Sequence, residues 1–282
     1  MKFNNLFKNH YPNISFVGDV MFDRNIKKKI DSDIFSEVTP FIQFMNFGVC
    51  NLETPITTNK KQFDKTSFAT EKLPDNFPFD VVNLANNHIY DSGLIGVENT
   101  LSYLNSRGIL SFGTEYSSCN IKTVGDKKIG FMGYCCNNFS SSNAKEYKDF
   151  DISFNFNKFR RDYEALKTQI KCDYIVVSLH WGEEYQKENL KQVELAHKLI
   201  DEYDVDFIYG HHPHVQQKVE KYKGKIIAYS LGNFLFQHIE NDTKETRKGK
   251  ILQIEFSPEM KYVEIDTVCE GPDFKPKIIN IL

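Results

Sequence analysis

The sequence lacks the features that mark several common classes of protein. Its six cysteines are scattered, with no CxxC pair, and six in 282 residues are too few for a disulfide scaffold. No stretch reaches the ~18 uninterrupted apolar residues of a membrane-spanning helix. The first ten residues contain no apolar segment of the kind found in signal peptides. We therefore expect a cytoplasmic protein with reduced thiols and no membrane span.

The sequence also has little net charge. Lys and Arg number 35 against 38 Asp and Glu, which gives a formal net charge of −3. This balance argues against a nucleic-acid-binding surface. A chain with 40% hydrophobic and 26% charged residues has ordinary globular composition, so disorder is excluded as its main state. No linker divides the chain convincingly, and we expect one domain over residues 1–282.

Short apolar runs alternate with polar helical segments, which predicts an α/β fold. The runs are rich in Val, Ile, Phe and Tyr, as buried strands should be: Ile14–Val17, Phe47–Leu52, Phe79–Ala85, Lys128–Tyr134, Tyr174–Leu179, Val205–Tyr209 and Lys225–Leu231. Two alternating segments, Ile251–Phe256 and Tyr262–Val268, predict a C-terminal hairpin over about residues 250–269.

Helices are expected between these runs, at about residues 93–106, 156–170 and 188–203. In the last of them, the spacing places Leu190, Val193, His197 and Ile200 on one face. The polar stretches Asn59–Asp64 and Glu240–Lys250 are interpreted as surface loops.

Side chains that can bind metal ions follow the ends of the apolar runs. They belong to Asp19, Glu53, Asn86, Asn87, His88, His180, His211, His212, His214 and Asn233. Open α/β sheets bind ligands where the carboxyl ends of parallel strands meet. A set of oxygen and nitrogen ligands without thiolate suits Mn, Fe, Zn or Mg, and Glu53 could bridge two ions about 3.5–4 Å apart. We expect one or two divalent ions, with manganese favoured.

Six motifs in order carry a resemblance to a known family, from about Ile14 to Phe236. They are Gly18-Asp19-Val20-Met21, Asn51-Leu52-Glu53, Asn86-Asn87-His88, His180-Trp181-Gly182, Gly210-His211-His212-Pro213-His214 and Ser230-Leu231-Gly232-Asn233-Phe234. The pattern resembles bacterial capsule-synthesis proteins of the poly-gamma-glutamate type, a branch of the calcineurin-like metallophosphoesterases. The resemblance implies a four-layer α/β/β/α sandwich with mixed sheets and a motif core over about residues 14–236.

The resemblance also implies roles for individual residues. The metal ligands would be Asp19, Glu53, Asn87, His180, His211 and His214. His88 would be a general acid or a donor to the transition state, and Asp91 could orient its imidazole. Substrate would be bound by Arg24, His212 and Asn233, with Arg24 holding an anionic group bidentately.

Three positions depart from the pattern of the wider superfamily. Met21 stands where a histidine usually binds the first metal, so that site has lost a ligand. Glu53 takes the place of a bridging aspartate. Two residues separate His211 from His214, so that His212 could replace His211 as ligand. One tightly bound and one weakly bound metal ion are expected.

Three functions are compatible with these residues. The leading hypothesis is a metal-dependent hydrolase that acts on a phosphate ester or related anionic group, on a small anionic or glycan-linked substrate, in capsule or surface polysaccharide biosynthesis. The second is ligation, hydrolysis or transport of poly-gamma-glutamate. The third, motivated by Met21, is a non-catalytic binding protein with a degenerate metal site. His10, His197 and His238 are interpreted as ordinary histidines.

Overall fold

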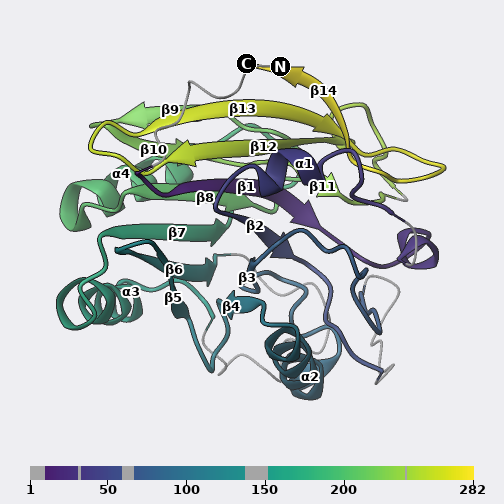
Figure 1. Cartoon of the computed structure of the whole chain (residues 1–282), viewed down its shortest axis with the longest axis horizontal. Helices are drawn as coiled ribbons and strands as arrows, with labels where there is room; N and C mark the ends of the chain where they lie inside the picture. The colour runs from purple at the N-terminus through teal and green to yellow at the C-terminus, as the bar shows by residue number, and fades with distance from the viewer. Residues whose placement is uncertain (1–9, 31–32, 59–66, 137–151, 239) are drawn as a thin grey trace.

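Two mixed β-sheets face each other in the computed structural model, which describes residues 10–30, 33–58, 67–136, 152–238 and 240–282 (Figure 1). The strands of the first sheet are β1 Asn13–Val20, β2 Phe47–Leu52, β3 Val81–Asn83, β4 Leu110–Phe112, β11 Asn233–Leu235, β12 Lys248–Glu255, β13 Lys261–Val268 and β14 Lys277–Ile281. Their order is β14-β13-β12-β1-β2-β3-β4, with β11 also paired to β1. β1 to β4 run parallel, and β12 to β14 are antiparallel to their neighbours.

The second sheet has the order β5-β6-β7-β8-β10-β9. Its strands are β5 Cys119–Val124, β6 Lys127–Cys135, β7 Tyr174–His180, β8 Phe207–His211, β9 Val219–Tyr222 and β10 Lys225–Ala228. The four central strands are parallel, and the two edge strands are antiparallel to their neighbours. The predicted C-terminal hairpin is present as β12 and β13.

Helices cover the outer faces of both sheets. They are η1 Ile26–Lys29 (a 3-10 helix), α1 Thr39–Gln43, α2 Gly93–Ser106, α3 Phe156–Glu164, η3 Ala165–Gln169 (a π-helix) and α4 Leu190–Tyr203. Asparagine side chains cap the N-termini of α3 and α4. Asn155 accepts the Lys158 N–H at 2.8 Å, and Asn189 forms a capping box with Gln192. The helix predicted over residues 156–170 is therefore α3 continued by a π-helical turn.

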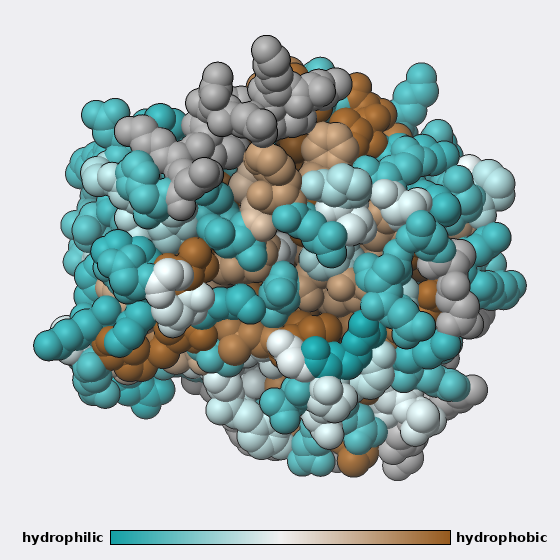
Figure 2. All heavy atoms as spheres, viewed as in Figure 1, coloured by the Kyte–Doolittle hydropathy of each residue, from teal (hydrophilic) through white to brown (hydrophobic). Residues whose placement is uncertain are grey.

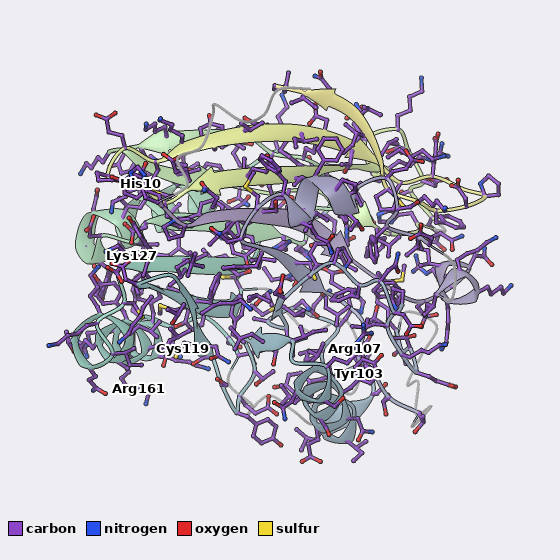
Figure 3. All side chains as sticks on the ribbon, in the orientation of Figure 1. His10, Tyr103, Arg107, Cys119, Lys127 and Arg161 are labelled. Carbon is purple, nitrogen blue, oxygen red and sulfur yellow. The ribbon has the colours of Figure 1, made fainter. Side chains whose placement is uncertain are left out.

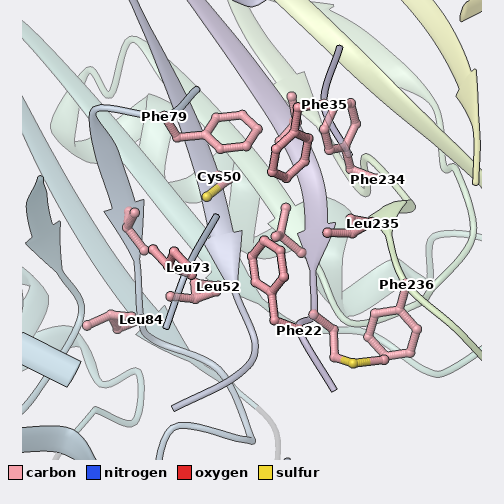
Figure 4. Close-up of a cluster of buried hydrophobic side chains, with 14 of the residues drawn as sticks. Phe22, Phe35, Cys50, Leu52, Leu73, Phe79, Leu84, Phe234, Leu235 and Phe236 are labelled. Carbon is pink, nitrogen blue, oxygen red and sulfur yellow. The ribbon is translucent and has the colours of Figure 1, made fainter. Parts of the chain in front are cut away.

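Three hydrophobic clusters separate four layers, which confirms the α/β/β/α arrangement. The cluster between the sheets contains Phe16 from β1 and Phe207 from β8, whose ring centroids are 4.7 Å apart. The second packs α3 and α4 on the outer face of the β5–β10 sheet. The third, drawn in part in Figure 4, joins Phe22, Phe35, Phe79 and Phe234 on the outer face of the first sheet.

Tyr103 of α2 and Arg107, which follows the last residue of this helix, hold the segment over residues 73–74. The hydroxyl of Tyr103 accepts the Leu73 N–H at 3.0 Å, and Arg107 donates to the Pro74 carbonyl at 3.0 Å. Figure 3 labels both side chains beside α2. These bonds attach the loop between β2 and β3 to the helix layer.

The face shown in Figure 2 mixes hydrophilic residues with small hydrophobic patches. Exposed apolar side chains include Leu190, Tyr116, Ile279 and Leu282. No helix within the described residues is long and apolar enough to cross a membrane.

Several boundaries differ from those predicted. β3 is confined to Val81–Asn83, β8 begins two residues later than expected, and β10 ends at Ala228. The predicted loop Glu240–Lys250 ends in β12, whereas Asn59–Asp64 lies outside the described residues. On the predicted face of α4, Ile200 is buried and Val193 packs partly buried against the core, whereas Leu190 is 72% exposed. Gln192, Ala196 and Leu199 are the other buried residues of the helix.

Replacement of Phe16 by alanine should destabilise the protein, because its ring fills the space between the two sheets. We expect a loss of about 3–5 kcal/mol in the free energy of unfolding, measured by urea denaturation. Leu190→Ala is the matched control, since its side chain is exposed, and should change stability by no more than about 0.5 kcal/mol. Equal losses for both variants would contradict the assigned packing.

Candidate metal centre

The carboxyl ends of parallel strands from both sheets meet at one place. Asp19 of β1 pairs in register with Asn51 of β2, and Asn51 pairs with Asn83 of β3. On the facing sheet, His180 at the end of β7 pairs with His211 at the end of β8. The sheet packing thus gathers residues that lie far apart in the sequence.

Two buried carboxylates share one hydrogen-bond donor. The carboxamide nitrogen of Asn51 lies 2.9 Å from Asp19 Oδ1 and 3.0 Å from Glu53 Oε1. Asn83 in turn donates to Asn51 Oδ1 at 2.9 Å, which fixes the orientation of the Asn51 amide. All four side chains are fully buried. Asn51 and Asn83 therefore position the carboxylates, a role that sequence reasoning missed although Asn51 stands in one of its motifs.

Four histidines surround the carboxylates. His211 Nδ1 lies 2.7 Å from Asp19 Oδ1, and His214 Nδ1 lies 3.5 Å from Asp19 Oδ2. His180 Nδ1 is 3.6 Å from Glu53 Oε1, and the ring centroids of His180 and His212 are 4.9 Å apart. His212 and His214 have φ values of 96° and 55°, so the backbone is strained where it turns these rings into the cluster. Both His211 and His212 thus belong to the cluster.

Burial shifts the pKa values of the acidic and histidine side chains in this cluster. Burial and the charge of Asp19 raise the pKa of Glu53 well above its usual range. Burial would also raise the pKa of Asp19, but the charges of His211 and His214 and the hydrogen bonds from His211 and Asn51 together outweigh it, and the pKa is lowered. Burial lowers the pKa of His180 well below its usual value and that of His212 to about 3. Once deprotonated, these carboxyl groups and imidazoles form the donor set that a divalent cation requires.

The cluster also contains buried polar atoms that have no hydrogen-bond partner among the described residues. They are Glu53 Oε2, both ring nitrogens of His180, His211 Nε2 and His212 Nδ1. Asp19, Glu53 and His214 each offer a ligand atom within 4.8 Å of the others. Because an unpaired buried polar atom is costly, these residues fit a bound metal ion.

The predicted acid and its orienting carboxylate lie together. His88 Nδ1 is 2.7 Å from Asp91 Oδ2, which also accepts the Phe68 N–H at 2.7 Å. The Phe68 ring stacks on His88 with centroids 4.1 Å apart. The guanidinium carbon of Arg24 lies over the Phe68 ring, 5.1 Å from the ring centroid. Arg24 also donates a hydrogen bond to the Gln237 carbonyl. Arg24 is thus placed near His88 through Phe68.

Asn87, a predicted metal ligand, and Met21, which replaces the usual histidine ligand, are both buried but in different surroundings. Asn87 is buried in the turn beside His88. Met21 is fully buried in the cluster on the outer face of the first sheet, and its sulfur accepts the Asp23 N–H at 3.0 Å. Met21 therefore packs as a core residue.

Asn233 and His238 differ from the sequence interpretation. Asn233 is fully buried, and its Oδ1 lies 2.9 Å from His214 Nδ1 while its Nδ2 donates to the Thr246 carbonyl at 2.8 Å. These contacts allow Asn233 to position His214, and its predicted contact with substrate stays a prediction. His238, interpreted as ordinary, has its Nε2 2.9 Å from Asn233 Nδ2, and its ring centroid is 5.0 Å from that of His214. No spacing in the sequence signals His238, because the contact depends on the loop after β11.

The two packed sheets with helices on their outer faces, together with the donor set at the strand ends, define a four-layer α/β/β/α protein with a candidate metal centre. Solved structures with the same fold include a Haemophilus influenzae NAD nucleotidase, 14% identical, with a TM-score of 0.50 over 95% of this chain and 60% of that one. A hypothetical protein from Thermus thermophilus, 15% identical, also has a TM-score of 0.50, over 95% of this chain and 96% of that one. At these identities, the likeness shows the fold alone.

Residues 13–238 match the family model described as bacterial capsule synthesis protein PGA_cap, and the chain belongs to this family. It is 32% identical to the PGA biosynthesis protein CapA of Bacillus subtilis (strain 168), over 82% of this chain and 65% of the relative. It is 29% identical to the capsule biosynthesis protein CapA of Bacillus anthracis, over 83% of this chain and 62% of the relative. The chain thus spans less than two thirds of the length of these relatives.

Replacement of Asn51 by leucine should weaken metal binding, because Asp19 and Glu53 would lose their shared donor. We expect Mn²⁺ affinity to fall by about 10–100-fold in isothermal titration. Asn120→Leu is the control, since the Asn120 amide donates to the Ser111 carbonyl outside the cluster and its loss should leave the affinity unchanged. Unchanged affinity in a folded Asn51→Leu variant would contradict the role of Asn51.

Proposed function

We propose that this protein is a metal-dependent phosphoesterase that acts in the synthesis of a bacterial capsule or surface polymer. The observation that carries this proposal is the buried cluster of Asp19, Glu53, His180, His212 and His214, with its unpartnered ligand atoms among the described residues. Membership of the capsule-synthesis family supports the biological setting. The proposed substrate is a phosphate ester or related anionic group.

The buried cluster would supply the ligands for two divalent ions. Asp19, Glu53 and His214 would hold one divalent ion, and His180 and His212 a second, weaker one, to which Asn87 would contribute its amide oxygen. His211 would keep Asp19 oriented through their 2.7 Å contact. Manganese is favoured among ions that accept mixed oxygen and nitrogen ligands. When bound, such ions polarise a phosphoryl oxygen and lower the pKa of bound water.

The remaining residues would act on the substrate. His88, held at Nδ1 by Asp91, would protonate the leaving oxygen or donate a hydrogen bond to it. The guanidinium of Arg24 would bind the anionic group on the side of Phe68. Burial of the proposed ligands and of His88 lowers the dielectric around them and so strengthens their electrostatic interactions.

Loss of a proposed ligand should remove both metal and activity. We expect His180→Ala and His212→Ala to lower bound manganese, measured by plasma mass spectrometry, and to reduce kcat/KM on a phosphate-ester panel by about 100-fold or more. His197→Ala, which alters a histidine that contacts Glu220 instead, is the control. A protein that binds no manganese and whose activity survives His180→Ala would refute the proposal.

Tightly bound metal without turnover would instead support a non-catalytic binding protein. Turnover of gamma-linked glutamate alone would support a function in hydrolysis or ligation of poly-gamma-glutamate.

The role of His88 can be separated from metal binding. His88→Asn should reduce kcat by about 10²–10⁴-fold while manganese content stays the same, because the substitution removes the proton donor and no proposed ligand. His10→Asn, at a ring that packs on Tyr11, should leave both quantities unchanged. A parallel loss of manganese in His88→Asn would show that His88 supports the metal instead.

A further inference from the structure

A second recess adjoins the metal centre and has a different chemical character. It has a volume of about 230 Å³, and its walls include Phe236, His238, Asp242, Arg247, Glu270 and Phe274. Phe236 and His238 also contact His214, with ring centroids 4.6 Å and 5.0 Å from that of the histidine. The recess and the metal centre therefore share a wall.

The charged groups of the recess are already paired with one another. Arg247 forms a two-pronged ion pair with Asp242, with Nε and Nη2 at 2.7 and 2.8 Å from the two carboxylate oxygens. Its third nitrogen, Nη1, lies 3.6 Å from Glu270 Oε2. The guanidinium thus faces two carboxylates, and these three groups together carry one more negative than positive charge. An anionic group entering here would meet an excess of negative charge.

The arrangement is better matched to a neutral group that carries hydroxyls. A hydroxyl can donate to the Glu270 carboxylate and accept from the guanidinium, whereas an ammonium group can only donate and would face the positive charge of Arg247. The rings of Phe236 and Phe274 offer apolar surface for the C–H face of such a group. The volume suits a group the size of one sugar ring.

The loop that carries Asp242 and Arg247 is fixed to the metal centre. The Thr246 carbonyl accepts from Asn233, the residue whose Oδ1 contacts His214. Thr246 and Thr243 also bond to each other, with the Thr243 N–H donating to Thr246 Oγ1 at 2.9 Å. The recess is therefore held at a set position next to the cluster.

We propose that this recess binds an uncharged, polyhydroxylated part of the substrate, such as a glycosyl group, beside the metal centre. The assignment of this part to the substrate rests on the proposed phosphoesterase function. The binding itself needs no metal ion and no turnover. A gamma-linked glutamate chain, which carries a carboxylate on every residue, does not match these walls.

Ligand-observed saturation-transfer NMR on the full chain in EDTA tests this assignment. The neutral probes are methyl β-D-glucopyranoside and methyl N-acetyl-β-D-glucosaminide, and the charged probe is γ-glutamylglutamate. We expect transfer to at least one glycoside, weaker or no transfer to the dipeptide, and a glycoside Kd about tenfold higher in Glu270→Gln, as the loss of a hydrogen bond to a charged group implies. Glu259→Gln, in the exposed turn between β12 and β13, is the matched control.

The possible outcomes separate this inference from the proposed function. Absence of transfer to both glycosides, a Kd unchanged in Glu270→Gln, or tighter binding of the dipeptide would each overturn it. Glycoside binding that depends on Glu270 would support it even if the phosphate-ester panel showed no turnover. Turnover of phosphate esters without glycoside binding would leave the phosphoesterase proposal in place and refute the glycosyl subsite.

Discussion

The face-to-face packing of the two sheets is the constraint on which the rest of the structure depends. Phe16 lies against Phe207 and Tyr209 across the interface, at ring-centroid distances of 4.7 and 5.0 Å. This contact aligns the carboxyl ends of β1 and β2 with those of β7 and β8. The metal centre exists only where these ends meet, because neither sheet alone supplies both the carboxylates and the histidines.

Close backbone approach completes the same junction. A side chain at Gly18 would collide with the Gly232 carbonyl, and one at Gly210 would collide with the Tyr229 carbonyl. The two glycines therefore allow the chain after β10 to lie directly against β1 and β8. That contact brings Asn233 to His214, and through Asn233 it also positions the loop that lines the second recess.

The site combines two environments that would select different parts of one substrate. The metal cluster offers neutral imidazoles and ion-binding carboxylates, with the guanidinium of Arg24 nearby, and so favours an anionic group. The adjoining recess has its guanidinium already paired and favours a neutral one. A phosphorylated glycosyl compound would match both environments. A glutamate polymer, with its many carboxylates, would not match the recess.

Local patterning in the amino-acid chain was enough to predict the fold class, the order of the motifs and the identity of most candidate ligands. Apolar runs and the residues that follow them are local features, so β2, β7 and the hairpin were predictable, and Asp19, Glu53 and His180 could be singled out. The same patterning did not reveal that Leu190 is exposed, that Asn51 bridges two carboxylates or that His238 reaches Asn233. These three points became visible only in the folded molecule, because burial and hydrogen bonds between residues distant in the chain arise when the sheets and loops pack together.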